Sequence, residues 1–463
     1  MTAKTKLIRL NAIEKATPTD TPGLWAHPDD EGHRYKELSY WTELAQLLES
    51  GGFDAIFLPD VLGQYDVYKG SRNTSLEQAI QSPINDPTYL LPAMAAVTKH
   101  LGFAVTSSTT YEHPYALARK LSTLDHLTQG RVGWNIVTSF LTSAARNFGL
   151  EAQLGAEERY DRGEEYLEVC YKLWEESWDD GAVVRNTEAR IYTDPAKVRD
   201  IGHEGKHFRV PGIHLSEPSP QRTPVLFQAG ASSSGRDFAA KHAECIFLNT
   251  PTLEATRAIV EDIRGRAAKL GRKPEHILFF PKLTVITAPT DEEAEAKYRD
   301  YLNYSSTEGL LALLGGWSGI DFSQFGPEKL LKFAQNSGNR SIVEYINERP
   351  EKKWTVEELA NLYAFGTSSL HVGSPAKIAD AMERFVEETG VDGFNISYLT
   401  RPGTIRDFVE LVVPELRRRG RVQAEYAPGT LREKLFGQGP GLPDSHPGGN
   451  RRQAAAIPEG ARS

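Results

Sequence analysis

Short apolar runs alternate with longer amphipathic patterns over most of the chain. The amphipathic run 114–130 begins with Pro114 and ends on Gly130, which are favourable residues at the two ends of a helix. Eight apolar runs of strand length occur, at 6–13, 53–60, 103–110, 132–139, 224–230, 244–250, 277–288 and 393–399. Apolar strands separated by helices predict a parallel sheet that is covered on both faces.

Two architectures fit this alternation, a TIM (β/α)8 barrel and an open doubly wound sheet, and hydrophobic periodicity does not separate them. Residues 305–370 fall outside the alternation and predict a helical insertion before the last strand. Residues 438–463 are rich in Pro, Gly and polar residues, which predicts a flexible C-terminal tail. The expected barrel domain is therefore 1–437.

Composition and charge narrow the function classes. The 463 residues are 40% hydrophobic and carry a formal net charge of −9, which disfavours nonspecific binding to nucleic acid or to acidic membranes. No run approaches the roughly 18 apolar residues of a membrane helix, and the apolar stretch near the N-terminus is too short for a signal peptide. The two cysteines, Cys170 and Cys245, lie in apolar contexts. We therefore expect reduced core thiols and a cytoplasmic protein.

Neutral polar residues recur at the ends of the predicted strands, where a barrel gathers its chemistry. They include Asn11, Thr106, Asn135, Gln228 and Asn395. The sequence shows neither a cluster of paired carboxylates nor His and Cys residues at metal-ligand spacing, so we expect no metal site. Neutral polar residues at strand ends also form turns. Their repetition over several strands, however, favours a site for a ligand that brings its own reactivity.

The segment QAGASSSGRDFAAKH (228–242) runs from a predicted strand through Gly and Ser into a helix. Backbone N–H groups at a helix N-terminus bind phosphate well, although a simple serine cap would look similar. HEGKH (203–207) matches the zinc pattern H-E-x-x-H, but that motif binds zinc only when it lies on a helix. Its Gly205 favours a turn that enters a strand instead. No G-x-G-x-x-G occurs between a strand and a helix, which disfavours a tight NAD(P)H site.

Several long motifs resemble one enzyme family: FDAIFLPDVLG (53–63), the run 83–139, ERYDRGEEYLEVCYKLWE (158–175) and EPSPQRTPVLFQAGASSSGRDFAAKHAE (217–244). The chain resembles the flavin-dependent, bacterial-luciferase-like monooxygenases of the nitrilotriacetate and dibenzothiophene-sulfone monooxygenase group, closest to the long-chain alkane and dimethyl sulfide monooxygenases. The resemblance implies a TIM barrel that receives FMN as FMNH2 from a separate NAD(P)H:flavin reductase. Oxygen would add at C4a of the flavin, and this peroxyflavin would oxygenate a small hydrophobic or organosulfur compound.

The resemblance also implies site residues, by matching positions. Those expected at the flavin ring are Asp60, Thr106, Asn135 and Thr138. Those expected at the flavin phosphate are Ala156, Tyr160, Ala231 and Ser232. Those expected at the substrate pocket are Thr17, Tyr65, Gln81 and Phe140.

The substrate side departs from the alkane-oxidising members. Thr17 is the nearest equivalent of a cysteine in their loop after strand one, and Phe140 replaces a histidine. The apolar LLALLGG (310–316) replaces histidines of their insertion. These changes indicate a differently shaped apolar pocket, and no general acid or base is assigned.

Two other functions remain open from the sequence. One is an F420-dependent oxidoreductase that transfers hydride on the same barrel, and the other is a non-catalytic flavin-binding protein. By analogy with other barrels of this kind, we expect a homo-oligomer, either a dimer or a tetramer.

Overall fold

The computed structural model describes residues 6–230, 232–250, 252–324 and 369–455. Eight parallel strands form a closed barrel, since β10 pairs with β11, β11 with β13, and β13 with β1. In barrel order they are β1 (Arg9–Ile13), β2 (Ala55–Leu58), β3 (Gly102–Ser108), β4 (Val132–Val137), β9 (Val225–Gln228), β10 (Cys245–Leu248), β11 (Leu278–Thr287) and β13 (Gly393–Ser397). Closure excludes the open doubly wound sheet and confirms the TIM barrel.

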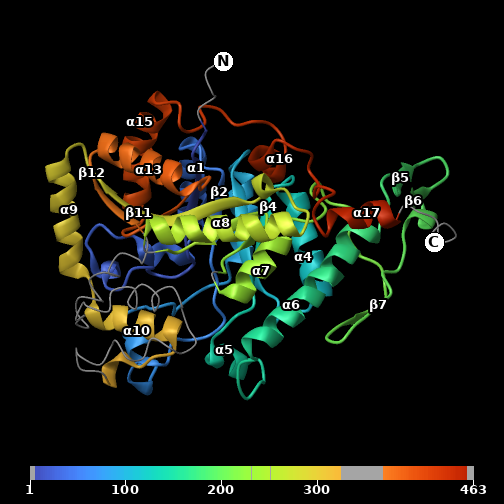
Figure 1. Cartoon of the computed structure of the whole chain (residues 1–463), viewed down its shortest axis with the longest axis horizontal. Coiled ribbons are helices and arrows are strands. Elements are labelled where there is room, and N and C mark those ends of the chain that lie inside the picture. Colours follow the sequence, from blue (N-terminus) through green and yellow to red (C-terminus); the bar gives the residue numbers. More distant parts are fainter. Residues whose placement is uncertain (1–5, 231, 251, 325–368, 456–463) are drawn as a thin grey trace.

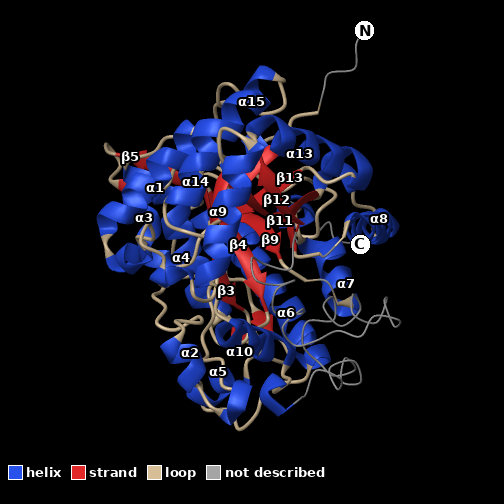
Figure 2. Cartoon of the chain, turned by 90° about the vertical axis from the view of Figure 1, so that its left-hand side faces the viewer, coloured by secondary structure: helices blue, strands red, loops and turns tan. Residues whose placement is uncertain are grey.

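Helices surround the strands on all sides, as Figure 2 shows. The helices that follow successive strands are α1 (Leu38–Ser50), α3 (Leu91–Ala96), α4 (Pro114–Leu127), α6 (Ala156–Tyr171), α7 (Ser233–His242), α8 (Leu253–Lys269), α13 (Pro375–Thr389), and the pair α14 (Gly403–Asp407) and α15 (Val413–Arg418). Short helices α2 (Asn73–Glu77) and α5 (Thr142–Asn147) lie in loops. The apolar faces of the helices that follow the strands pack on the outward side chains of the strands, and together these residues form the largest core cluster.

Alternate strand residues point into the barrel. Phe57 and Phe247 stack there with ring centroids 4.0 Å apart, and Phe227 stacks on Phe247 at 5.1 Å. Helix α16 (Leu431–Phe436) adds Leu431 and Leu435 to the same interior cluster. The barrel is therefore a packed core, and a ligand can enter only at an end of it.

The insertion lies between β11 and β13. Helix α9 (Asp291–Tyr304) precedes the predicted insertion, and helix α10 (Thr307–Ser318) belongs to its described part and extends beyond one end of the barrel (Figure 1). Residues 325–368 of the predicted insertion lie outside the described residues. Strand β12 (Ser369–Gly373) then pairs in parallel with the second half of β11, a short element that the hydrophobic pattern did not predict.

Two small hairpins also escaped sequence prediction, β5 (Val183–Asn186) with β6 (Ile191–Thr193), and β7 (His203–Glu204) with β8 (Arg209–Val210). The second hairpin contains HEGKH, as the glycine indicated. Its imidazoles diverge to different acids, because His203 Nε2 lies 3.2 Å from Glu165 and His207 Nε2 lies 2.8 Å from Asp161.

The expectation of a flexible tail over 438–463 is wrong for residues 438–452. His446 is fully buried and its Nε2 bonds the carbonyl of His242 at 2.8 Å. Arg452 pairs with Glu175 at 2.8 Å, and helix α17 (Gly449–Ala455), which begins within this segment, lies beside the outer helices of the barrel (Figure 1). The segment has few apolar residues, so composition pointed to disorder, but its contacts satisfy buried polar groups of distant helices.

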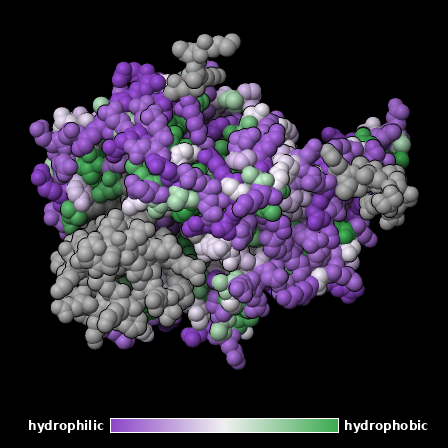
Figure 3. Space-filling view, in the orientation of Figure 1, coloured by the Kyte–Doolittle hydropathy of each residue, from purple (hydrophilic) through white to green (hydrophobic). Residues whose placement is uncertain are grey.

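The visible surface in Figure 3 is mainly hydrophilic, with scattered apolar residues. None of the helices in the described ranges combines the length and the apolar character that a membrane span needs.

Candidate functional site

Strands β3 and β4 bring two of the predicted residues together. Thr106 and Asn135 are register partners, and Asn135 Nδ2 donates to Thr106 Oγ1 at 2.9 Å. Both side chains are buried on the inner side of the barrel wall, since their neighbours Val105, Trp134 and Ile136 pack outward against the helices. Asn135 Oδ1 is buried and has no hydrogen-bond partner within the described part of the chain.

Asp60 follows β2 by two residues, next to the same stretch of β3, because Leu58 is the register partner of Val105. Burial raises the pKa of the Asp60 carboxyl to about 7, and repulsion from Asp86 adds to the shift. The Val61 N–H and Lys120 oppose it only in part. Asp60 therefore changes charge near neutral pH, as residues of functional sites often do.

Hydrogen bonds hold the loop after β4 against the end of β3 and against α6. Thr110 Oγ1 donates to the carbonyl of Thr138 at 2.7 Å, and the Ser108 and Ser139 hydroxyls lie 2.8 Å apart. Arg159 of α6 donates to the carbonyl of Ser139. These contacts connect the Thr106–Asn135 pair to the first turn of α6.

The predicted phosphate residues meet where α6 and α7 begin. Ser232 caps α7 by accepting from the Gly235 N–H at 3.1 Å, and the Tyr160 hydroxyl bonds the same serine. A Cβ on Gly235 would lie only 2.8 Å from Tyr160 Oη, so glycine permits this close approach. Ala156 is exposed at the first turn of α6, whose N-cap Gly155 has no side chain to satisfy the free N–H groups. Ala231 lies outside the described residues.

The two loops that carry Thr17 and Gln81 contact each other. Thr19 and Ile80 form an isolated parallel bridge, and the Asn85 N–H donates to the carbonyl of Ala16 at 2.8 Å. Thr17 is fully buried, and its hydroxyl finds no partner among the residues described. Gln81 is buried with φ of +54°, an unusual backbone state that the surrounding structure must hold.

Tyr65 lies in a separate apolar cluster that covers the loops after β2 and β4. The cluster consists of Tyr65, Tyr68, Ile80, Leu141, Ala144, Leu311, Ala312, Leu313, Leu314 and Phe322, so α10 of the insertion supplies much of it. Trp317 Nε1 donates to Tyr65 Oη at 3.0 Å, and a Cβ on Gly316 would lie 2.3 Å from the Tyr65 ring. The apolar LLALLGG thus covers Tyr65 directly.

Phe140 does not join this group. Its side chain is 46% exposed, whereas the next residue, Leu141, is buried in the cluster. The backbone of Ser139 has φ of +54°, which redirects the chain just before Phe140. A role for Phe140 in the pocket stays a prediction.

Sequence reasoning missed a group of buried charges beside Thr17. Asp20 contacts Lys15 and lies 3.3 Å from Lys282 of β11. Burial alone would raise the pKa of Asp20, but the two lysines outweigh it and hold that pKa below its usual value. The only sequence signal was a lysine within the apolar run ILFFPKLTVITA.

A second buried pair supports the loop after β1. Arg401 Nε lies 2.5 Å from Glu14 Oε1, and Arg401 also donates to the carbonyls of Lys15 and Thr17. Burial raises the pKa of Glu14 to about 8, although Arg401 opposes the shift. Arg401 thus fixes the backbone that carries Thr17.

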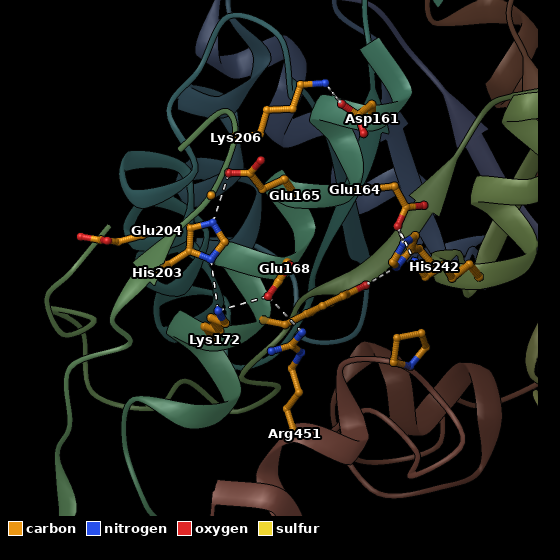
Figure 4. Close-up of a pocket in the computed structure, with 14 residues that line it drawn as sticks. Asp161, Glu164, Glu165, Glu168, Lys172, His203, Glu204, Lys206, His242 and Arg451 are labelled. Carbon is orange, nitrogen blue, oxygen red and sulfur yellow. Dashed lines mark hydrogen bonds and ion pairs between the residues drawn. The ribbon is translucent and has the colours of Figure 1, made fainter. Parts of the chain in front are cut away.

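A different hollow lies on the outside of the barrel, between α6, the β7–β8 hairpin, α7 and the segment before α17. It has a volume of about 500 Å³ and charged walls. Figure 4 shows its charges paired with one another: Glu165 with His203, Lys172 with Glu168, and Glu164 with His242. Because these groups satisfy each other, the hollow lacks the unsatisfied groups of the barrel mouth.

The barrel mouth therefore presents amides, hydroxyls and the Asp60 carboxyl, whose pKa is raised, next to two helix N-termini. Such groups orient and hold a planar, hydrogen-bonding ligand with a phosphate, and the reactive atom would belong to that ligand.

Comparison with known proteins agrees with this geometry. The family model described as luciferase-like monooxygenase matches residues 22–393. The chain is 53% identical to the long-chain alkane monooxygenase of Geobacillus thermodenitrificans, over 96% of this chain and 97% of that one. It is 50% identical to the dimethyl-sulfide monooxygenase of Hyphomicrobium sulfonivorans, over 97% and 94% of the two chains. The solved structure of a riboflavin lyase with modified FMN and riboflavin superimposes with a TM-score of 0.90 at 36% identity, over 96% and 100% of the chains.

Proposed function

Since the chain belongs to the luciferase-like monooxygenase family and is a flavin-dependent monooxygenase, we propose that it is the oxygenating component of a two-component system. A separate NAD(P)H:flavin reductase supplies FMNH2, and the enzyme uses O2 to oxygenate a small hydrophobic or organosulfur compound. We further propose that it works in the cytoplasm as a homo-oligomer, either a dimer or a tetramer.

One observation carries the proposal. Asn135 is held by Thr106 at the inner wall of the barrel mouth, while its Oδ1 is buried without a partner in the described residues. A buried amide oxygen of this kind costs about 1–3 kcal/mol unless a ligand satisfies it. A flavin ring has N–H groups at its edge and a flat shape that suits the neighbouring strand ends.

The other residues fit the rest of FMN. The hydroxyls of Tyr160 and Ser232 and the free N–H groups of α6 would hold the phosphate, and Gly235 leaves room for it. Asp60 and Thr138 would border the ring. When bound and reduced, the flavin supplies the electrons that activate O2.

The chain itself orients the ligands and excludes water. The apolar cluster around Tyr65 covers the mouth on the side of the insertion, so water has little access to the reacting atoms there. Thr17 Oγ1 and the Tyr65 hydroxyl supply polar contacts within otherwise apolar walls, which is typical of a small-molecule site.

The test uses purified protein with a generic flavin reductase, NADH, FMN and a panel of alkanes, dialkyl sulfides and sulfones. Oxygen uptake coupled to an oxygenated product is the expected result, together with quenching of FMN fluorescence on binding. Preference for F420 with no oxygen uptake would establish hydride transfer instead. Tight binding of oxidised FMN without turnover would establish a flavin-binding protein.

A further inference from the structure

Arg159 lies in the first turn of α6, directly before Tyr160, and its side chain is half-buried. One of its terminal N–H groups donates to the carbonyl of Ser139 in the loop after β4. Its Nε is buried and has no hydrogen-bond partner in the described ranges. A guanidinium has five N–H donors, so this single contact leaves donors available for another acceptor.

No acid neutralises the charge of Arg159 within the part of the chain that the structure describes. Burial lowers the pKa of its guanidinium, and the groups that oppose this shift are the hydroxyls of Tyr160 and Tyr111. Glu157 and Glu158, its neighbours in the sequence, are exposed. A half-buried charge without a counter-ion is costly, so its presence here indicates an anion that binds beside it.

The proposed phosphate cradle lacks a cation of this kind. Its other groups, the hydroxyls of Tyr160 and Ser232 and the backbone N–H groups of α6, are neutral. Arg236 lies in the first turn of α7, but it already pairs with Asp262 at 3.1 Å. Burial raises the pKa of the Tyr160 hydroxyl and the charge of Arg159 opposes that shift, which indicates that the guanidinium lies near the cradle. An arginine binds phosphate oxygens by charge-assisted hydrogen bonds.

The existing contact of Arg159 reaches the substrate side of the mouth. Ser139, whose carbonyl it holds, has φ of +54°, and the Ser139 hydroxyl lies 2.8 Å from that of Ser108. Two residues further on, Leu141 is buried in the apolar cluster around Tyr65. Arg159 therefore joins the cradle to the segment that carries part of the proposed substrate wall.

Building on the proposed function, we propose that Arg159 binds the phosphate of FMN and, through the Ser139 carbonyl, uses it to hold the loop after β4 in place for the substrate. The phosphate then does more than add affinity, because one guanidinium contacts both the phosphate and the loop. Riboflavin would fill the ring site and leave the loop less ordered. By linkage, whatever orders this loop also favours FMN over riboflavin.

The first measurement compares the dissociation constants of FMN and riboflavin by fluorescence titration. Arg159→Met should reduce the preference of the wild type for FMN by about tenfold or more, as suits the loss of a charge-assisted contact. Arg159→Lys should keep part of that preference, because an ammonium also pairs with phosphate. Riboflavin reports on the ring site alone, so an unchanged riboflavin constant shows that a variant keeps its fold.

The second measurement is the hydrogen exchange of residues 139–150, followed by mass spectrometry at saturating FMN or riboflavin. In the wild type, FMN should slow the exchange of this segment about threefold or more relative to riboflavin, since it stabilises the loop against local opening. In Arg159→Met the two flavins should give the same exchange rates.

Arg162→Met is the matched control. It removes a guanidinium from the same helix, where it lies over the Phe208 ring at 4.4 Å from the centroid. The preference for FMN and the exchange of the loop should both stay as in the wild type.

An undiminished preference for FMN in Arg159→Met would overturn the proposal. Equal weakening of both flavins would do the same, since Arg159 would then be a purely structural residue. A lost preference with the exchange of the loop unchanged would overturn the link to Ser139. If the wild type binds neither flavin, the proposed function fails as well, whereas equally tight binding of both flavins leaves that function standing and refutes this inference alone.

Discussion

The indole N–H of Trp317 donates to the hydroxyl of Tyr65 at 3.0 Å, which joins α10 of the insertion to the loop after β2. Trp317→Phe keeps the aromatic packing but leaves the Tyr65 hydroxyl without its donor. We expect KM for a dialkyl sulfide to rise about fivefold, the value of one neutral hydrogen bond, with kcat nearly unchanged. Steady-state kinetics check this, with Trp25→Phe, at a 46% exposed site, as the control.

Asn135→Ala should weaken FMN binding by about tenfold. It removes a buried amide oxygen that has no partner in the described residues and that would accept a hydrogen bond from the flavin, while the amide nitrogen donates to Thr106. The thermal midpoint should change little. Fluorescence titration with FMN gives the dissociation constant, and Asn303→Ala, on the exposed face of α9, serves as the control. An unchanged constant would remove Asn135 from the flavin site.

The raised pKa of Asp60 has a consequence for stability. Between about 3.8, its ordinary value, and about 7, the folded protein holds a proton that the unfolded chain has released. The contribution of Asp60 to stability is therefore fully present below 3.8 and is lost as pH rises through 7.

Asp60→Asn should accordingly raise Tm relative to wild type at pH 8 and show a much smaller difference at pH 4. Differential scanning calorimetry at the two pH values measures this. A difference of the same size at both would mean that the Asp60 carboxyl does not titrate in this window.

Gly235→Ala places a Cβ 2.8 Å from Tyr160 Oη and 3.0 Å from Ser232 Oγ, within the proposed phosphate cradle. We expect FMN to bind about tenfold more weakly while riboflavin, which lacks the phosphate, binds as before. The ratio of the two dissociation constants is the readout. Gly265→Ala in α8, where a Cβ meets nothing within 4 Å, is the matched control.

Arg452→Ala tests the packing of the segment after residue 437. It removes the arginine from Glu175, whose side chain is fully buried, so the free energy of unfolding should fall by about 3 kcal/mol. Arg451→Ala breaks a pair with the partly exposed Glu176 and should lower it by less than about 1 kcal/mol. Urea denaturation compares the two variants, and equal losses would mean that the pair of Arg452 with buried Glu175 contributes no more than an exposed ion pair.

The hydrophobic pattern alone predicted the eight barrel strands and most helices, because strands buried on both faces must be apolar and the helices between them must be amphipathic. Resemblance of motifs then gave Thr106, Asn135, Tyr160 and Ser232, which the structure brings into two connected groups. Short elements such as β12 and the two hairpins carry too few residues for a periodic signal.

What the sequence determined, then, is the alternation that makes a barrel and the polar residues at its strand ends. Tertiary structure decided the closure of the sheet, the packing of residues 438–452, and the meeting of Lys282 with Asp20, 262 positions apart. The physical reason is that local periodicity records which face of an element is buried, whereas an ion pair or a binding site depends on distances between elements that only the folded chain defines.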